Sequence, residues 1–318
     1  MQPGLYLGID GGQSGTVALI ANGSGRVIGR GCGGPCNHVG AAEGRVKFLS
    51  AVGQSLEEAC REAKLDPGAV SFSAACLGLS GGAEDKETYA RELIRSAKFK
   101  ITHDAEIALS GATAGEPGII VIAGTGSIAF GRNDAGRTAR AGGWGYIFGD
   151  EGGAFDLTRR ALRAALRYEE GWGPETSLRK LLLEATGAAS ANELLHRFYT
   201  SEYQRTAIAC FAPLVSQAAA DGDATAQEVA KDAALKLAWF VEGVYRGLFT
   251  WGENVPVAYI GGVFQSQPVL SEFEVGIRAA IPCRTQPPQF NPAAGAVLEA
   301  LRLDGNESAL SDVPKSEK

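Results

Sequence analysis

A strand that runs into a glycine turn occurs twice in the chain and constrains its fold more than any other feature. The first copy is Leu5–Thr16, where apolar residues alternate up to Asp10 and are followed by Gly11 and Gly12. Glycines after a strand permit a tight turn whose N–H groups point outward together, which suits phosphate oxygens. Asp10 beside this turn suits a magnesium ion or its water shell, because hard cations take oxygen ligands. The competing interpretation is a simple hairpin turn with an incidental acid.

The second copy is Gly118–Ala129, where an apolar strand leads into Gly124-Thr125-Gly126-Ser127. Each copy is followed by two further strand-like segments, so the same three-strand opening occurs twice and indicates an ancient duplication. Two phosphate-binding turns in one chain imply two related halves with a nucleotide between them. We expect an N-terminal lobe (1–116) joined by a helix near the C-terminus (291–303), a C-terminal lobe (117–290), and a polar, frayed tail (304–318).

The remaining segments predict helices added after each set of three strands, which indicates a mixed α/β sheet in each half. Apolar residues at helical or strand spacing define these elements. In the first half they are a helix over Ala41–Ala63, a strand over Phe72–Leu79, a helix over Glu84–Ala97, a strand over Lys98–Thr102 and a helix over Ala105–Ala114. In the second half they are a helix over Ala154–Arg167, mostly helix over Thr176–Thr250, a strand over Val255–Ile260, a helix over Val269–Ala280 and an edge strand around Cys283–Thr285.

Composition excludes several classes of protein. The chain has 318 residues, a net charge of −6 and a pI near 5.3, which argues against a nucleic-acid or anionic-membrane surface. We see no signal peptide and no apolar run of transmembrane length. The six cysteines are scattered, so we expect mostly buried thiols in a reducing cytoplasm and no zinc site.

The glycine turns also resemble two other nucleotide-binding motifs. The chain has no Gly-Lys-Ser/Thr, so it is not a P-loop protein. Gly124-x-Gly126-x-x-Ala129 matches a dinucleotide fingerprint, which requires that a helix follow the glycines. Here the following residues indicate a strand and a hairpin turn, which disfavours a dehydrogenase.

Two acids at element boundaries are candidates for chemistry. Asp104 follows a strand, where open α/β sheets place their ligands, and it could take the proton of a substrate hydroxyl that attacks a phosphate. The alternative for Asp104 is a helix N-cap, and both roles can hold at once. Asp150, ahead of the helix at Ala154, has the same ambiguity, and Glu151 could stabilise the same helix end.

Other candidates lie in glycine-rich loops. Asn37 could bind a sugar hydroxyl or be an ordinary turn residue, and the adjacent His38 is similar. Trp144 could stack on a sugar face or plug a core. Gly261 and Gly262 after a strand could let the backbone approach an adenine or a ribose, or form a plain turn.

Taken in order, these motifs resemble the N-acetylglucosamine kinase group of the BadF/BadG-type ATPase family, which has the actin/hexokinase/Hsp70 fold. Each motif is weak alone, but the ordered set is specific and spans most of the chain. The motifs are Leu7-Gly8-Ile9-Asp10-Gly11-Gly12-x-Ser14, Asn37-His38, Gly78-Leu79-Ser80-Gly81-Gly82, Thr102-His103-Asp104-Ala105, Ala123-Gly124-Thr125-Gly126-Ser127, Gly142-Gly143-Trp144-Gly145, Gly149-Asp150-Glu151-Gly152 and Ile260-Gly261-Gly262-Val263.

The resemblance implies an α/β fold of two actin/hexokinase-like lobes, each a ribonuclease H-like domain, with the nucleotide in the cleft between the lobes. It implies Asp104 as the catalytic base and Asp10 on the Mg²⁺ side. The ATP-binding residues that it implies are Gly11, Gly12, Gln13, Ser14, Thr125, Gly126, Gly261 and Gly262. The residues that would face the amino sugar are Asn37, His38, Asp104, Ser127, Gly143, Trp144, Gly145 and Asp150.

The implied reaction is ATP-dependent phosphorylation of the 6-hydroxyl of N-acetylglucosamine, without a covalent intermediate. Glucosamine, N-acetylmuramate and glucose are alternative substrates. The family also contains ATP-driven activators of dehydratases that carry a bridging iron–sulfur cluster, but no cysteine lies between Cys76 and Cys210 to hold one. A non-catalytic sugar or nucleotide sensor is a further alternative, although a sensor has no need of a base. Family analogy implies a homodimer.

Overall fold

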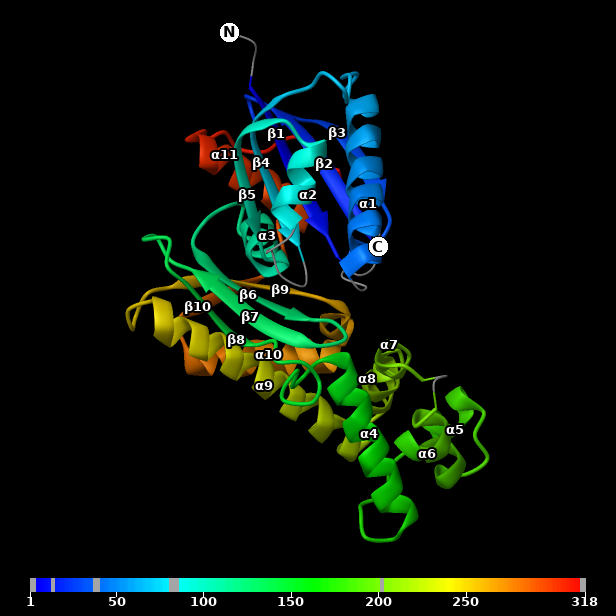
Figure 1. The fold of residues 1–318 in the computed structure, drawn as a ribbon. Coiled ribbons are helices and arrows are strands. Elements are labelled where there is room, and N and C mark those ends of the chain that lie inside the picture. The colour runs from blue at the N-terminus through cyan, green and yellow to red at the C-terminus, as the bar shows by residue number, and fades with distance from the viewer. Residues whose placement is uncertain (1–3, 13–14, 37–40, 80–85, 201–202, 315–318) are drawn as a thin grey trace. The chain divides into compact units, whose positions relative to one another are not determined.

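The chain forms two compact units, one of residues 1–116 with 288–318 and one of residues 117–287. The structure is a computed structural model, and it describes residues 4–12, 15–36, 41–79, 86–200 and 203–314. Figure 1 shows the elements of each unit along the chain.

The first unit is built on a five-stranded sheet in the order β3-β2-β1-β4-β5. β1 pairs antiparallel with β2 and parallel with β4, and β5 continues the sheet in parallel. The central strands β2, β1 and β4 are largely buried, because apolar side chains leave both faces of the sheet toward helices. They are β1 (Leu5–Gly11), β2 (Thr16–Asn22), β3 (Val27–Gly33), β4 (Phe72–Leu79) and β5 (Ser96–Thr102).

Helices cover both faces of this sheet (Figure 1). α1 (Ala41–Glu62) and α2 (Lys86–Leu93) pack on one face, and α3 (Asp104–Ala112) and α11 (Pro292–Asp304) pack on the other. A glycine permits the close approach of α11 to β1, because a Cβ on Gly8 would lie 2.3 Å from the backbone nitrogen of Val297. The last helix of the chain therefore completes the core of the first unit.

The segment after α11 is fixed to the first unit over residues 305–314. Ser311 donates its N–H to the carbonyl of Gly25 and accepts a hydrogen bond from the N–H of Val27. Arg26 and Asp312 form an ion pair of 2.7 Å. The expectation of a frayed tail was wrong for these residues, because backbone pairing with the edge of β3 holds a segment whose side chains are polar.

The second unit repeats the sheet order of the first, as β8-β7-β6-β9-β10. β6, β7 and β8 form an antiparallel meander, and β9 and β10 continue it in parallel from β6. The repeated order agrees with the duplication that the sequence indicated. The strands are β6 (Gly118–Ala123), β7 (Ser127–Arg132), β8 (Thr138–Gly142), β9 (Val255–Ile260) and β10 (Cys283–Gln286).

In the second unit, α9 (Ala224–Leu248) and α10 (Gln267–Ala280) lie on one face of the sheet and the other helices pack on helices, all through one large apolar core (Figure 1). The long helix α9 contacts β6, β7 and β8, and α10 packs against α9. No helix in the described part of the chain is long and apolar enough to span a bilayer. The other helices are α4 (Ala154–Glu169), α5 (Leu178–Thr186), α6 (Ala191–Phe198), α7 (Arg205–Ala209), α8 (Ala212–Ala220) and the single turn η1 (Gly262–Gln265).

Asp223 joins two segments of the second unit by capping α9. Its carboxylate accepts hydrogen bonds from the N–H of Ala226 (3.0 Å), the hydroxyl of Thr176 (2.8 Å) and the N–H of Ser177 (2.6 Å). Desolvation raises the pKa of Asp223, but the hydrogen bonds from Ala226, Ser177 and Thr176 together outweigh it and leave the pKa below its ordinary value. The ionised form of Asp223 therefore stabilises the fold.

We expect Asp223→Ala to lower the free energy of unfolding by about 1 kcal/mol at pH 7, as loss of an N-cap does. Because the folded-state pKa is depressed, this contribution is present above the unfolded-state pKa of about 3.9 and is lost as the pH falls through the folded-state value. Urea unfolding at pH 7 and near pH 3 measures the difference, which should shrink in acid. Asp221→Ala, an exposed neighbour, is the control. A difference that does not change with pH would contradict the assignment.

Candidate functional site

The first predicted phosphate turn joins β1 to β2, and its backbone is tightly held where it is described. Gly12 donates its N–H to the carbonyl of Gly15 (3.0 Å), and its own carbonyl accepts from the N–H of Cys36 (3.1 Å). A Cβ on Gly11 would lie 2.5 Å from the Sγ of Cys36, so position 11 has no room for a side chain. A Cβ on Gly12 would meet no atom of the described residues closer than 3.9 Å.

Two carboxylates lie at the same edge of the first sheet. Asp10 is at the end of β1, and Asp104 opens α3 directly after β5 and is exposed. Burial, and then the charge of Asp104, raise the pKa of Asp10 to about 6. A carboxylate beside a second one suits Mg²⁺, which binds one or two carboxylates together with water and phosphate oxygens. The donors present in this unit therefore fit the predicted magnesium ion.

Asp104 also contacts the start of its own helix. Its Oδ1 accepts a hydrogen bond from the N–H of Ala105 (2.8 Å), while the N-cap position of α3 is His103, whose side chain makes no capping bond. The predicted N-cap is thus shifted by one residue. Asp104 is the first helical residue, where its negative charge interacts favourably with the helix dipole.

Lys86, at the start of α2, was not predicted to be part of the site. Lys86 is only 2% exposed. Burial lowers the pKa of its ammonium, and the charges of Cys36 and Asp104 raise it by a smaller amount. Its ammonium therefore interacts electrostatically with the predicted base. No local sequence pattern indicates this burial, because a lysine in a short charged helix is typical of an exposed surface.

The second predicted phosphate turn lies on the N-terminus of α4. The carbonyls of Gly124 and Thr125 accept hydrogen bonds from the N–H groups of Ala154 (2.8 Å) and Phe155 (3.1 Å). The residues after Gly126 form strand β7, which pairs with β6 along its length. A helix does not follow the glycines, so this is not the dinucleotide fingerprint.

Asp150 connects this turn to the rest of the second unit. Its buried carboxylate accepts a hydrogen bond from the N–H of Ser127 (3.4 Å) and forms an ion pair with Arg205. The hydroxyl of Ser127 donates to the carbonyl of Glu151 (2.6 Å). The N-cap of α4 is Gly153, so the capping role considered for Asp150 was wrong. Arg205, which follows a helix break, is a site residue that the sequence did not reveal.

The glycine-rich loop before Asp150 bends back onto Ser127. Gly143 and Gly145 have left-handed backbone angles, with φ of +72° and +78°, and Gly143 donates its N–H to the carbonyl of Ser127 (2.9 Å). Trp144 is 65% exposed, with the guanidinium of Arg140 4.8 Å from its ring centre. The alternative that Trp144 is a buried aromatic side chain of the hydrophobic core was therefore wrong.

The two predicted ATP motifs of the second unit share one cavity of about 590 Å³, within the range of small-molecule sites. Thr125 and Gly262 both line it. Position 261, next to Gly262, must be a glycine, because its φ is +115° and a Cβ would lie 2.2 Å from the carbonyl oxygen of Ala123. Ser266 lines the same cavity, and its buried hydroxyl has no hydrogen-bond partner among the described residues. Although Ser266 occupies the N-cap of α10, its side chain does not cap the helix.

Four predicted site residues lie outside the described residues. They are Gln13 and Ser14 in the first turn and Asn37 and His38 in the loop before α1.

The sheet order found in both units is that of the actin/hexokinase-like fold. The structure is similar to a ROK family glucokinase from Streptomyces griseus, with a TM-score of 0.56 and 17% identity over 93% of this chain and 98% of that chain. This likeness shows the fold. A structure from Chromobacterium violaceum described as an N-acetylglucosamine kinase candidate has a TM-score of 0.73 and 28% identity over 93% of this chain and 98% of that chain.

The chain belongs to the BadF/BadG/BcrA/BcrD ATPase family, whose family model matches residues 7–300. A relative from Clostridium acetobutylicum, named N-acetylmuramic acid/N-acetylglucosamine kinase, is 35% identical over 274 residues, which are 82% of this chain and 85% of the relative. The predicted family and fold are confirmed, and the class of ATP-dependent sugar kinase is confirmed by these relatives.

We expect Gly126→Ala to disturb the contact between the second turn and Asp150. An added Cβ would lie 2.4 Å from Oδ2 of Asp150, so the carboxylate or the turn must move. Overpacking of this kind costs about 1–3 kcal/mol of unfolding free energy, measurable by denaturant titration. Gly124→Ala is the matched control, because a Cβ there meets no atom within 4 Å. Equal stability of the two variants would show that Asp150 is not held against the turn.

Proposed function

We propose that this sugar kinase transfers the γ-phosphate of ATP to the 6-hydroxyl of N-acetylglucosamine. The observation that carries the proposal is the pair of carboxylates at one sheet edge, with Asp10 half-buried and Asp104 exposed. Phosphoryl transfer to an alcohol needs a metal-side carboxylate and a base within reach of the hydroxyl, and this pair supplies both.

The ATP-binding roles belong to the backbone turns. Gly11 and Gly12 offer a tight turn for phosphate oxygens, and Thr125 and Gly126 offer the corresponding turn of the second unit. The cavity lined by Thr125 and Gly262 suits the nucleoside, because its volume fits a small molecule and the Ser266 hydroxyl lacks a partner. Gln13 and Ser14, which lie outside the described residues, are also assigned to ATP binding in this proposal.

Asp104 acts as the general base. Its carboxylate takes the proton of the 6-hydroxyl while the oxygen attacks the γ-phosphorus and the bond to the ADP oxygen breaks. Mg²⁺, when bound on the Asp10 side, supplies charge neutralisation for the phosphates. The buried ammonium of Lys86, which interacts with Asp104, helps to hold this carboxylate in place.

The sugar-binding roles fall to the loop around Asp150. The ion pair with Arg205 fixes the Asp150 carboxylate, which can then accept hydrogen bonds from sugar hydroxyls. Ser127, Gly143, Trp144 and Gly145 adjoin it in the same loop system, and exposed Trp144 offers an aromatic face for the sugar. Asn37 and His38 are proposed to add contacts from the first unit.

The substrate among the amino sugars is part of the proposal. The relatives named above support N-acetylglucosamine and N-acetylmuramate, and glucosamine and glucose are the other candidates. A coupled assay of ADP release over these four sugars decides between them. We also propose a homodimer and a cytoplasmic location; all six cysteines are free thiols, which suits a reducing compartment.

We expect Asp104→Ala to lower kcat by about 10²–10⁴-fold, the contribution typical of a general base, with little change in ATP affinity. Stopped or coupled assays of sugar-dependent ADP release give kcat, and calorimetry gives the Kd for ATP. Asp134→Ala, an exposed residue in the turn after β7, is the control and should match the parent enzyme. Near-parental turnover by the Asp104 variant would remove Asp104 as the base.

We expect Ser266→Ala to raise the KM for ATP about 2–10-fold, because one hydrogen bond to the nucleoside is lost. The same change should leave the free protein as stable as the parent or more stable, since it removes a buried hydroxyl without a partner. Initial rates at varied ATP concentration give KM, and thermal unfolding gives the stability. Ser50→Ala on the exposed face of α1 is the control. A fall in stability without any change in KM would contradict the assignment.

A further inference from the structure

The strand that leads to Asp104 carries polar side chains on one of its faces. Because side chains alternate along a strand, Lys98, Lys100 and Thr102 of β5 project on the same side. Each of them contacts a carboxylate of α3 or α11, the two helices that pack on this face of the first sheet. The contacts become more buried toward Asp104, since the side chain of Lys98 is 48% exposed, that of Lys100 is 31% exposed and Thr102 is buried.

Thr102 and Glu106 close the turn from β5 into α3, which carries Asp104. The hydroxyl of Thr102 donates to one carboxylate oxygen of Glu106, and the ammonium of Lys100 donates to the other (2.7 Å). The N-cap residue of α3, His103, makes no side-chain capping bond, so the bond between Thr102 and Glu106 is a side-chain link that spans the start of the helix. This link fixes the backbone on either side of Asp104.

Glu299 of α11 anchors Lys100 in the core of the first unit. Its side chain is 2% exposed, and its carboxylate accepts hydrogen bonds from Lys100 (3.0 Å), Ser110 and Arg302 (2.6 Å). Ser110 lies on α3, so Glu299 binds that helix directly as well as through Lys100 and Glu106. Positions 106 and 110 are four residues apart and lie on one face of α3. The helix is therefore held to β5 and α11 at two successive turns.

A charged residue at position 299 is costly if stability is its only role. The other buried residues of α11 are alanine, glycine, valine and leucine, and replacing buried ion pairs by apolar residues is often neutral or stabilising. Burial lowers the pKa of Lys100, but the charges and hydrogen bonds of Glu299 and Glu106 outweigh it and leave the pKa above its ordinary value. Lys100 therefore stays charged. What these groups add is a fixed geometry, because hydrogen bonds between ionised groups are short and directional.

We propose that Lys100, Glu106 and Glu299 are positioning residues for Asp104: they fix the first turn of α3 and with it the carboxylate that takes the proton of the sugar hydroxyl. They act through Asp104 and transfer no proton themselves. A general base must lie within hydrogen-bond reach of the proton that it takes, and a misplacement of about 1 Å costs on the order of 100-fold in rate. This inference rests on the proposed function, in which Asp104 is the base.

The test uses Lys100→Met, which keeps an unbranched side chain and removes the charge that joins α3 to α11. We expect kcat to fall about 10–100-fold, with KM for ATP and for the sugar within about twofold of the parent values, because only the placement of the base changes. Lys100→Arg restores the charge and should recover most of kcat. Lys98→Met is the matched control, because it removes an ion pair between the same strand and α11, with Asp304 (2.9 Å), that involves no residue of α3.

A double substitution separates positioning from a merely structural role. If Lys100 acts through the base, adding Lys100→Met to Asp104→Ala should lower the residual rate by less than about twofold, because residues that act as a unit have non-additive effects. Denaturant unfolding shows that each variant is folded under the assay conditions. The full loss of kcat in the Asp104→Ala background, or parental kcat in folded Lys100→Met, would overturn the inference.

Thr102→Val is the second variant, in case Lys100→Met does not fold. It removes the hydroxyl that donates to Glu106 and leaves both ion pairs of Lys100 in place. We expect kcat to fall about 2–10-fold, which corresponds to one hydrogen bond, and an unchanged kcat would contradict the positioning role. Near-parental turnover of Asp104→Ala would instead remove the proposed base. A large loss in Asp104→Ala together with parental kcat in both other variants would overturn only the positioning role.

Discussion

Close backbone contacts that only glycine permits are the constraint on which the rest of this structure depends. A side chain at Gly8 would separate α11 from β1, and one at Gly261 would strike the carbonyl of Ala123. At Gly126 the missing side chain leaves the space that the carboxylate of Asp150 fills. Main-chain atoms approach neighbouring elements most closely at these points, because glycine has no side chain there.

Charged groups are then held in place by partners that lie far apart in the sequence. The Asp150 carboxylate is fixed by Arg205, 55 residues later, and interacts with Ser127 on the neighbouring strand. The charge of Asp104, on a different element, helps to raise the pKa of Asp10, and buried Lys86 adds a positive charge near Asp104. Burying such charged groups costs desolvation free energy. Their occurrence beside a cavity or a sheet edge therefore indicates a candidate functional site.

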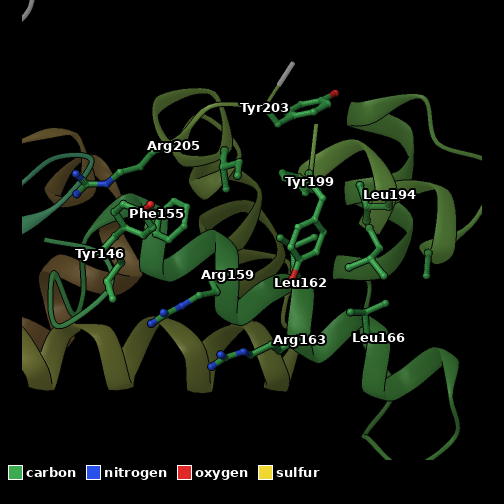
Figure 2. A pocket seen from close by; sticks show the side chains of 15 residues that line it. Tyr146, Phe155, Arg159, Leu162, Arg163, Leu166, Leu194, Tyr199, Tyr203 and Arg205 are labelled. Carbon is green, nitrogen blue, oxygen red and sulfur yellow. The ribbon is translucent and has the colours of Figure 1, made fainter. Parts of the chain in front are cut away.

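Among the described residues of the second unit, the buried side-chain polar atoms without a hydrogen-bond partner all belong to residues that line cavities. The buried polar side-chain atoms without partners in the described residues are Nε of Arg159, Nε of Arg205 and Oγ of Ser266. The two arginines line the cavity of about 650 Å³ along α4 (Figure 2), and Ser266 lines the cavity shared by Thr125 and Gly262. Because buried polar groups are otherwise nearly always paired, these atoms single out the two cavities as candidate ligand sites.

The sequence by itself determined the family, the two glycine turns and the repeated three-strand opening, because alternating apolar residues and glycines are local signals that do not depend on distant partners. It also identified Asp104 and Asp150 but left their capping roles open, and it predicted a frayed end where the backbone of Ser311 pairs with that of Gly25 and Val27. Only the tertiary structure decided that Lys86 is buried near Asp104, that Arg205 holds Asp150, and that Ser266 and Arg159 face cavities. Burial and pairing arise from elements that contact each other only in the folded chain. The spacing of residues along the sequence does not indicate which charged side chain becomes buried.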